Sequence, residues 1–266
     1  MSLQIEKIAK SKISEVDFST LKFGQIFTDH MFECDFENGE WQTPIIRPYQ
    51  PILFDPSLKV FHYGQAVFEG MKAYKDDNND VWLFRPDQNQ ERLNISAERM
   101  DMPAFPKDLF FEGLLTLLKM DSEWVQKGEG NALYIRPFIF ATEDRLSVSP
   151  SQQYTFCVIL SPSGAYYAAG VDDGIRLLIT TKFHRAVSGG TGASKASGNY
   201  AASLRAGKAA AEYGAAQVLY LDANNKQIEE VGAMNHFHIL KDGTVNLTNQ
   251  ELLVEDIPVL DDIFGQ

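Results

Sequence analysis

A single lysine, Lys195, stands inside a glycine-rich stretch at residues 188–203. Four glycines fall within ten residues there: Gly189, Gly190, Gly192 and Gly198. Glycine lets the backbone take positive φ angles and come close to a bound group. A helical run is predicted directly afterwards, at 200–213. Composition alone leaves two interpretations open, a ligand-binding loop and a flexible loop with a solvated lysine.

The chemistry open to such a lysine depends on its shelter from water. A desolvated lysine gives up its proton more easily than one in solvent, and the neutral amine is a nucleophile. A neutral amine can form a Schiff base with a carbonyl compound. If the glycine-rich loop is a binding site, carbonyl chemistry is therefore predicted at Lys195.

An arginine is the second candidate for binding chemistry. Arg92 lies in a helix predicted from its N-cap, Asp87, to Met100, with Leu93 and Ala97 on its apolar stripe. A planar guanidinium on the first turns of a helix suits a phosphate group. A solvated arginine is the alternative.

Composition restricts the partners of the chain. Its 266 residues are 44% hydrophobic and 12% aromatic, which is enough to fill one large or two modest domain cores. The net charge of −12 argues against nucleic acid and anionic membranes, since binding to phosphate backbones needs clustered Lys and Arg.

The cysteines and the N-terminus bear on location. Cys34 and Cys157 are far apart in apolar segments and are expected to be buried thiols in a reducing compartment. Residues 1–12 have no apolar signal core, and no stretch approaches the length needed to span a membrane. A cytoplasmic location is expected.

His236 and His238 are interpreted as strand residues rather than metal ligands.

Turn residues between apolar segments predict the hairpins of the first half. Asn38-Gly39, a pair typical of type I′ turns, separates a strand within 23–36 from one that begins at Trp41. The run 76–80 separates two further strands. In the segment 60–74, aromatic side chains such as Phe68, together with Glu69, either face a ligand or belong to the core.

The rest of the chain alternates helices and strands. An amphipathic helix is predicted at 108–125, with an apolar stripe made of Phe111, Leu114, Leu115 and Leu118. Strands are predicted at 132–140, 154–160 and 174–181, and hairpins at 217–231 and 236–247. Gly214 is the expected end of the helix at 200–213. The run 161–164 is the best candidate linker, so we expect a domain boundary near 162–170.

Three segments together resemble one enzyme family. They are the stretch 188–203, Phe68-Glu-Gly-Met-Lys-Ala-Tyr74 and Glu230-Val-Gly-Ala-Met-Asn235, and they are similar to those of branched-chain amino acid aminotransferases, class IV pyridoxal-phosphate enzymes. The resemblance covers most of 23–245. It implies an α+β fold of two domains, 1–162 and 171–266, joined by an interdomain loop at 163–170, with the cofactor cleft between them and a homodimer in which Tyr63 approaches the partner's site.

The same resemblance implies roles for individual residues. Lys195 matches the lysine that carries pyridoxal 5'-phosphate and shuttles the proton. Arg92, rather than Arg85, matches the phosphate ligand in the run Leu83-Phe-Arg-Pro-Asp-Gln-Asn-Gln-Glu-Arg92. Tyr200 matches the tyrosine that contacts the phenolic oxygen of the cofactor, and Glu230 the carboxylate beside the pyridine nitrogen.

The resemblance also implies a substrate pocket. The matching residues are Phe23, Tyr63, Phe68, Tyr134, Arg136 and Ala233. The alternation of side chains along a strand places Tyr134 and Arg136 on one face, and a loop over 165–167 is expected to cover the cleft in part. The implied reaction is amino transfer between leucine, isoleucine or valine and 2-oxoglutarate.

Alternatives remain. A D-amino-acid aminotransferase or an aminodeoxychorismate lyase would share the fold. After Leu247 the family continues with a Gly-Val-Thr turn and a Gly-Thr-Ala loop that this sequence lacks, and 261–266 only faintly resembles the residues before that loop. A non-catalytic remnant that serves as a binding protein is therefore the alternative from another class.

Overall fold

The computed structural model describes residues 2–164 and 174–247. Contacts divide the chain into two compact units. The first comprises Met1–Gly170 with Ser194–Ser197, and the second comprises Val171–Ala193 with Gly198–Gln266. Most of the expected interdomain loop, the loop over 165–167 and the segment 261–266 lie outside the described residues. The domain boundaries given above stay a prediction.

The described part of the first unit contains a nine-stranded sheet with the order β1-β4-β2-β9-β8-β6-β7, in which β3 pairs with β2 and β5 pairs with β8. Pairing is antiparallel except between β1 and β4. The strands are β1 Gln4–Ile5, β2 His30–Glu37, β3 Glu40–Trp41, β4 Ile45–Pro48, β5 Ala66–Phe68, β6 Met71–Lys75, β7 Val81–Leu83, β8 Ala132–Ala141 and β9 Tyr154–Ser163.

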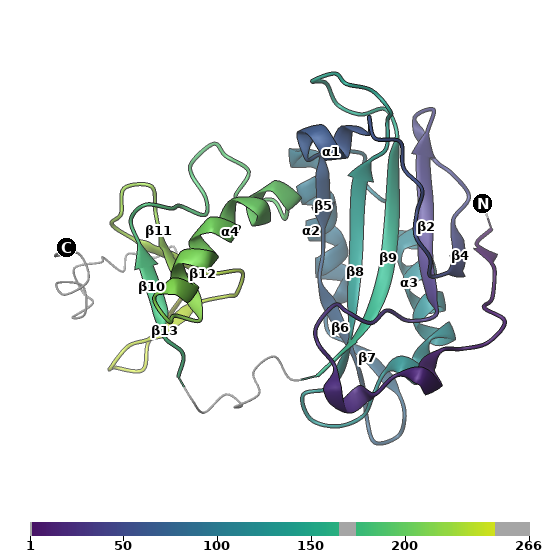
Figure 1. Ribbon diagram of the computed structural model, residues 1–266, viewed down its shortest axis with the longest axis horizontal. Coiled ribbons are helices and arrows are strands. Elements are labelled where there is room, and N and C mark those ends of the chain that lie inside the picture. Colours follow the sequence, from purple (N-terminus) through teal and green to yellow (C-terminus); the bar gives the residue numbers. More distant parts are fainter. Residues whose placement is uncertain (1, 165–173, 248–266) are drawn as a thin grey trace. The chain divides into compact units, whose positions relative to one another are not determined.

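Helices α2 (Pro86–Arg99) and α3 (Lys107–Met120) lie on one face of this sheet (Figure 1). Their apolar side chains, such as Leu93 and Leu114, share one fully buried core with Phe32 and Phe156 of the sheet. The short helix α1 (Lys59–Tyr63) and three short 3-10 helices, Ile13–Glu15, Phe18–Thr20 and Ser122–Trp124, complete the described elements of this unit. This packing makes α2 and the strands rigid supports for side chains at their ends.

The structure corrects the predicted ends of both long helices. The N-cap of α2 is Arg85, in the left-handed conformation, because Pro86 occupies the first helical position and its fixed φ angle suits that place. Asp87 lies in the first turn instead. Helix α3 stops at Met120, and a 3-10 turn follows. On α3, Leu115 is 54% exposed, whereas Phe110 and Leu117 are buried.

The strand predictions were right in position and less so in extent. Asn38 and Gly39 both have positive φ angles, as a type I′ turn requires, so that hairpin is confirmed. The first strand is His30–Glu37, so it begins seven residues after the start of its predicted segment, 23–36, and ends one residue beyond it. Strand β9 continues through Ser163, so three residues of the candidate linker belong to the sheet.

The second unit is built around a small sheet and one helix. Its elements are β10 Leu177–Thr180, α4 Ser197–Glu212, β11 Gln217–Leu221, β12 Ile228–Val231, β13 Phe237–Ile239 and β14 Val245–Leu247. Strand β11 pairs in parallel with β10 and antiparallel with β12, and β13 and β14 form a separate hairpin. Helix α4 begins three residues earlier than predicted, and Gly214 follows it with a φ angle of 66°.

Both cysteines are free, buried thiols, as expected. Burial raises the pKa of Cys34 to about 12 and the pKa of Cys157 well above its usual value. In the part of the chain that the structure describes, no helix has the length and apolar character needed to cross a membrane.

A buried carboxylate fastens the N-terminal segment to the sheet. Asp29 accepts hydrogen bonds from the Ser11 hydroxyl at 2.5 Å, the Lys12 amide at 3.1 Å and the Trp124 indole at 3.0 Å. Burial alone would raise the pKa of Asp29, but these hydrogen bonds outweigh it and hold the pKa below its ordinary value.

This depressed pKa predicts a stability that depends on pH. The contribution of Asp29 is complete above the ordinary carboxyl pKa and is lost as pH falls through the lower folded-state pKa. Asp29→Asn should reduce the free energy of unfolding by about 1–3 kcal/mol at pH 7, and by less at pH 3. Urea unfolding at the two pH values measures this. A loss that grows toward low pH would contradict the assignment.

Candidate active site

The backbone of Lys195 is held by the first unit. Its amide donates to the buried Ser96 hydroxyl of α2 at 2.9 Å, and its carbonyl accepts from the Phe68 amide at 3.1 Å. An isolated bridge joins Ala196 to Val67 of β5. Lys195 and Ala196 thus lie beside β5 in an antiparallel arrangement, which makes the setting of Lys195 ordered backbone rather than a free loop.

The amine of Lys195 and the guanidinium of Arg136 share one aromatic neighbour. Lys195 Nζ lies 5.2 Å from the centre of the Phe68 ring, and Arg136 Cζ lies 4.5 Å from it. Cations are attracted to aromatic faces at such distances. The sequence predicted all three residues as site residues, and the structure brings them together.

A pocket of about 180 Å³ lies beside this group, lined by aromatic and polar side chains. The lining residues are Phe23, Gly24, Phe27, Tyr134, Arg136, Ile159 and Ser161. Phe23 meets the ring of Tyr134 edge-on at 4.8 Å. Arg136 donates to the Tyr134 hydroxyl at 2.7 Å, so the two residues share a face of β8, as predicted.

Two polar atoms of this pocket are buried without a hydrogen-bond partner among the described residues, Nε of Arg136 and Oγ of Ser161. A buried polar group without a partner costs free energy, so such groups mark places where a ligand atom would be stabilised. The pocket can therefore take a small molecule with an apolar body and a hydrogen-bond acceptor.

Glycine is required at position 70, the residue before strand β6, because it lies against Tyr134. A Cβ atom at Gly70 would lie 2.2 Å from the hydroxyl oxygen of Tyr134. Only a residue without a side chain lets Tyr134 keep its place and its bond with Arg136. The predicted motif Phe68-Glu-Gly thus has a local structural reason.

Arg92 forms an ion pair with a carboxylate that the sequence did not single out as a site residue. Fully buried Glu69 accepts from Arg92 Nε at 2.5 Å and from Nη2 at 2.9 Å. It also accepts from Asn89 at 2.8 Å and from the Gly70 amide at 3.1 Å. This two-point pairing fixes the plane of the guanidinium.

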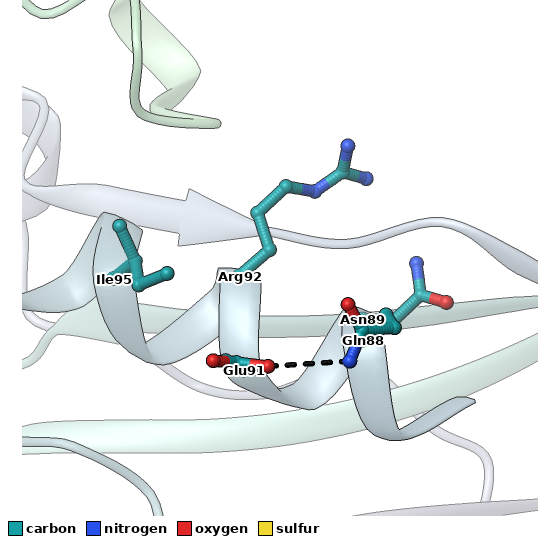
Figure 2. A pocket seen from close by; sticks show the side chains of 5 residues that line it. All are labelled: Gln88, Asn89, Glu91, Arg92 and Ile95. Atoms are coloured by element: carbon teal, nitrogen blue, oxygen red, sulfur yellow. Dashed lines mark hydrogen bonds between the residues drawn. The ribbon is translucent and has the colours of Figure 1, made fainter. Parts of the chain in front are cut away.

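The side chain of Arg92 is nevertheless 53% exposed. Figure 2 shows it extending outward from α2. With Gln88, Asn89, Glu91 and Ile95 it lines a pocket of about 470 Å³. An oriented, accessible guanidinium is suited to an anionic group such as phosphate.

Tyr200 and its surroundings belong to the second unit. Tyr200 lies in the first turn of α4, and its carbonyl accepts from the Ser203 hydroxyl at 2.7 Å. The glycine-rich loop before it is tied back by Asn199, which bonds the Thr191 hydroxyl at 2.6 Å and the Thr191 carbonyl at 2.8 Å. The loop and the first turn of α4 therefore hold each other.

Glu230 lies on β12 opposite Tyr220 and forms an ion pair with Arg185. The two side chains are 26% and 16% exposed, so the pair is largely sheltered from solvent. Burial raises the pKa of its neighbour Glu229, and the charge of Asp222 adds to that effect. Arg185 thus compensates the charge of a carboxylate on the edge strand of this sheet.

Two further residues, Tyr63 and Ala233, were predicted as substrate residues. Tyr63 ends α1 and is 41% exposed, and its ring centre lies 6.2 Å from that of His62. Ala233 is exposed in a turn that the bridge between Val231 and Met234 closes.

The residues that sequence reasoning missed, Ser96 and Arg185, each act on a predicted residue from far along the chain. Glu69 was noted only as either ligand-facing or core. In the sequence, the one signal for Ser96 was its place next to the apolar stripe of Leu93 and Ala97.

A family model for class IV aminotransferases ("Amino-transferase class IV") matches residues 66–248. This segment is more than half of the chain and contains Lys195, Arg92, Tyr200 and Glu230. The chain belongs to the class IV aminotransferases.

Individual members of this family are closely similar. The chain is 52% identical over 226 residues to branched-chain-amino-acid transaminase 1 of Bacillus subtilis, covering 84% of this chain and 64% of that protein. It is 46% identical over 234 residues to the branched-chain-amino-acid aminotransferase of Mycobacterium tuberculosis, covering 86% and 63%. The chain thus spans somewhat less than two thirds of the length of these relatives.

A solved structure agrees with the fold. The branched-chain amino acid aminotransferase of Escherichia coli superposes with a TM-score of 0.64 at 26% sequence identity, over 82% of this chain and 66% of that one. The expected fold, an α+β class IV aminotransferase, is confirmed.

Proposed function

We propose that this chain is a branched-chain amino acid aminotransferase that transfers the amino group between leucine, isoleucine or valine and 2-oxoglutarate, with pyridoxal 5'-phosphate as cofactor. The observation that carries the proposal is the position of the Lys195 amine on the ring of Phe68, beside the aromatic pocket of Tyr134 and Arg136. The names of the similar proteins favour this reaction over others within the family.

The side chains present fit the cofactor. An amine suits its aldehyde, a fixed guanidinium suits its phosphate, and a carboxylate suits its protonated pyridine nitrogen. Lys195, Arg92 and Glu230 are the proposed residues, and Tyr200 would donate to the phenolic oxygen. When bound, pyridoxal phosphate supplies an electron sink for the substrate α-carbon.

The residues of the chain would then perform four tasks. Lys195 would hold the cofactor and would move a proton at the substrate α-carbon. Arg92 binds the phosphate in the orientation that Glu69 imposes. Glu230, compensated by Arg185, keeps the pyridine nitrogen protonated.

The fourth task is recognition of the substrate. Phe23, Phe68 and Tyr134 would exclude water around the branched side chain, and Arg136 offers an oriented cation for an acidic substrate. Tyr63 and Ala233 are proposed to complete the pocket.

A panel of amino donors tests the proposed function. Purified chain with added pyridoxal phosphate should show the visible absorbance of covalently bound cofactor and should use leucine, isoleucine and valine with 2-oxoglutarate. Preference for D-alanine, or pyruvate release from aminodeoxychorismate, would assign a different member of the fold. Absence of cofactor attachment would identify a binding protein instead.

The proposal includes a homodimer in the cytoplasm. The buried, free thiols agree with a reducing compartment. On the first unit, four large apolar side chains, Leu53, Phe54, Phe61 and Tyr63, are between 37% and 98% exposed. They lie in or next to an apolar groove of about 440 Å³ between α1 and the sheet. Exposed apolar surface of this kind is typical of interfaces.

Phe61→Glu should therefore weaken self-association by at least about tenfold, because a charge would replace an aromatic ring within the proposed interface. Sedimentation velocity at micromolar concentration measures it. Leu146→Glu, at another exposed apolar side chain (65% exposed), is the control. A wild-type monomer at that concentration would refute the dimer.

A further inference from the structure

Two consecutive residues of the first unit and two residues of helix α2 form a closed ring of contacts. The Phe68 amide binds the carbonyl of Lys195, whose amide binds the Ser96 hydroxyl. Four residues earlier on the same helix, Arg92 is held by Glu69, which follows Phe68. We call these five residues the α2–β5 frame.

The geometry of the helix sets the dimensions of the frame. Residues four apart lie on the same side of a helix, about 6 Å apart along its axis. Because Ser96 holds the backbone of Lys195 and Glu69 holds the guanidinium of Arg92, the helix sets the distance between the Lys195 backbone and the Arg92 guanidinium. Glu69 and Ser96 are both fully buried, which restricts their movement.

We propose that Glu69 and Ser96 are positioning residues that match the chain to a ligand carrying both an aldehyde and a phosphate group. Glu69 acts on the phosphate group through Arg92, and Ser96 acts on the aldehyde through Lys195. The inference rests on the proposed function, because it takes Lys195 and Arg92 as the cofactor ligands.

The energetic reason lies in preorganisation. An unrestrained arginine loses rotamer freedom when it binds phosphate, whereas an arginine that is already held has less to lose. The Glu69 carboxylate takes one edge of the guanidinium through Nε and Nη2. The remaining N–H groups of this planar group point away from Glu69, and Arg92 lines the pocket of about 470 Å³ there.

The roles of Glu69 and Ser96 can be tested separately by comparing the binding of pyridoxal phosphate with that of pyridoxal, which lacks the phosphate. Binding is measured by the absorbance of the covalently bound ligand during titration. Glu69→Gln removes the charged partner of Arg92 and should raise the apparent Kd for pyridoxal phosphate about tenfold. Its effect on pyridoxal should stay below about twofold, since pyridoxal makes no phosphate contact.

Ser96→Ala should act differently, because it disturbs the lysine rather than the arginine. We expect it to weaken the binding of pyridoxal and of pyridoxal phosphate by the same factor, about three- to tenfold. Inorganic phosphate, added as a competitor, should lose potency in Glu69→Gln and keep it in Ser96→Ala.

Two matched controls distinguish positioning from general stability. Glu33→Gln removes a similar partner from Arg47 on the sheet, where the two groups meet at 2.6 Å. Ser151→Ala removes a buried hydroxyl that donates to the Gln153 carbonyl. Both controls should leave the two Kd values unchanged even where thermal unfolding shifts.

The outcomes are separable. If wild-type chain attaches neither ligand, the proposed function fails. If it attaches both and Glu69→Gln changes the two Kd values equally or not at all, Glu69 has no positioning role.

Arg92→Lys provides a second test of phosphate binding, since it keeps the charge but loses the two hydrogen bonds that orient the guanidinium. It should reproduce the selectivity of Glu69→Gln, and an equal loss for both ligands would contradict the proposal.

Discussion

Replacing Lys195 with alanine is expected to abolish covalent attachment of pyridoxal phosphate and to lower the transamination rate at least about 10⁴-fold, because both attachment and proton transfer use this amine. The fold should change little. The backbone bonds of Lys195 to Ser96 and Phe68 do not need its side chain, and a cation beside an aromatic ring contributes about 1 kcal/mol or less at an accessible site.

Three measurements check this prediction. An absorbance scan reports attachment, thermal unfolding reports stability, and borohydride reduction followed by peptide mapping locates the modified lysine. Lys182→Ala is the matched control, since Lys182 is an exposed lysine that precedes the same loop. A label on Lys182 or Lys208 in the wild-type chain would overturn the proposed site.

Removing Glu230 is expected to impair activation of the cofactor without preventing its attachment. In Glu230→Ala the cofactor should still attach, because Lys195 and Arg92 are unchanged. The transamination rate should fall about 10²- to 10³-fold, since the pyridine nitrogen loses the charge that keeps it protonated. Single-turnover kinetics with leucine, set beside the absorbance of the bound cofactor, measure the two effects separately.

The ion pair with Arg185 supplies the control. Glu230→Ala leaves a sheltered arginine without its partner, so some loss of stability is expected as well. Arg185→Gln breaks the same pair but keeps the carboxylate. If Glu230 serves the cofactor, Arg185→Gln should retain far more activity than Glu230→Ala. Equal losses in both variants would show that the pair is merely structural.

Local rules were sufficient where neighbouring residues decide the conformation. Asn38-Gly39 has the two positive φ angles that its composition predicts, and the stripe of Leu93 and Ala97 is buried on α2 as its spacing predicts. The start of α2 was missed by two residues because two local signals competed there. Asp87 is a good N-cap, but Pro86 at the first helical position prevailed.

The arrangement of the site could be predicted only in part. The residue types and the family motifs identified Lys195 and Arg92, yet their supports lie elsewhere in the sequence. Ser96 and Lys195 are 99 residues apart, and Glu69 and Arg92 are 23 apart. A buried polar side chain must find a partner, but periodicity and propensity say nothing about which one, because that choice is made by tertiary packing.

The grouping of Ser194–Ser197 with the first unit bears on the order of folding. Every strand of the large sheet precedes residue 164, so its core, apart from Ala196, is synthesised before Lys195. Closing a long chain segment onto β5 and α2 costs entropy that only a few hydrogen bonds repay. We therefore expect the sheet to form first and the segment around Lys195 to pack against β5 and α2 late. A newly made chain would then form its hydrophobic core before its reactive amine is in position.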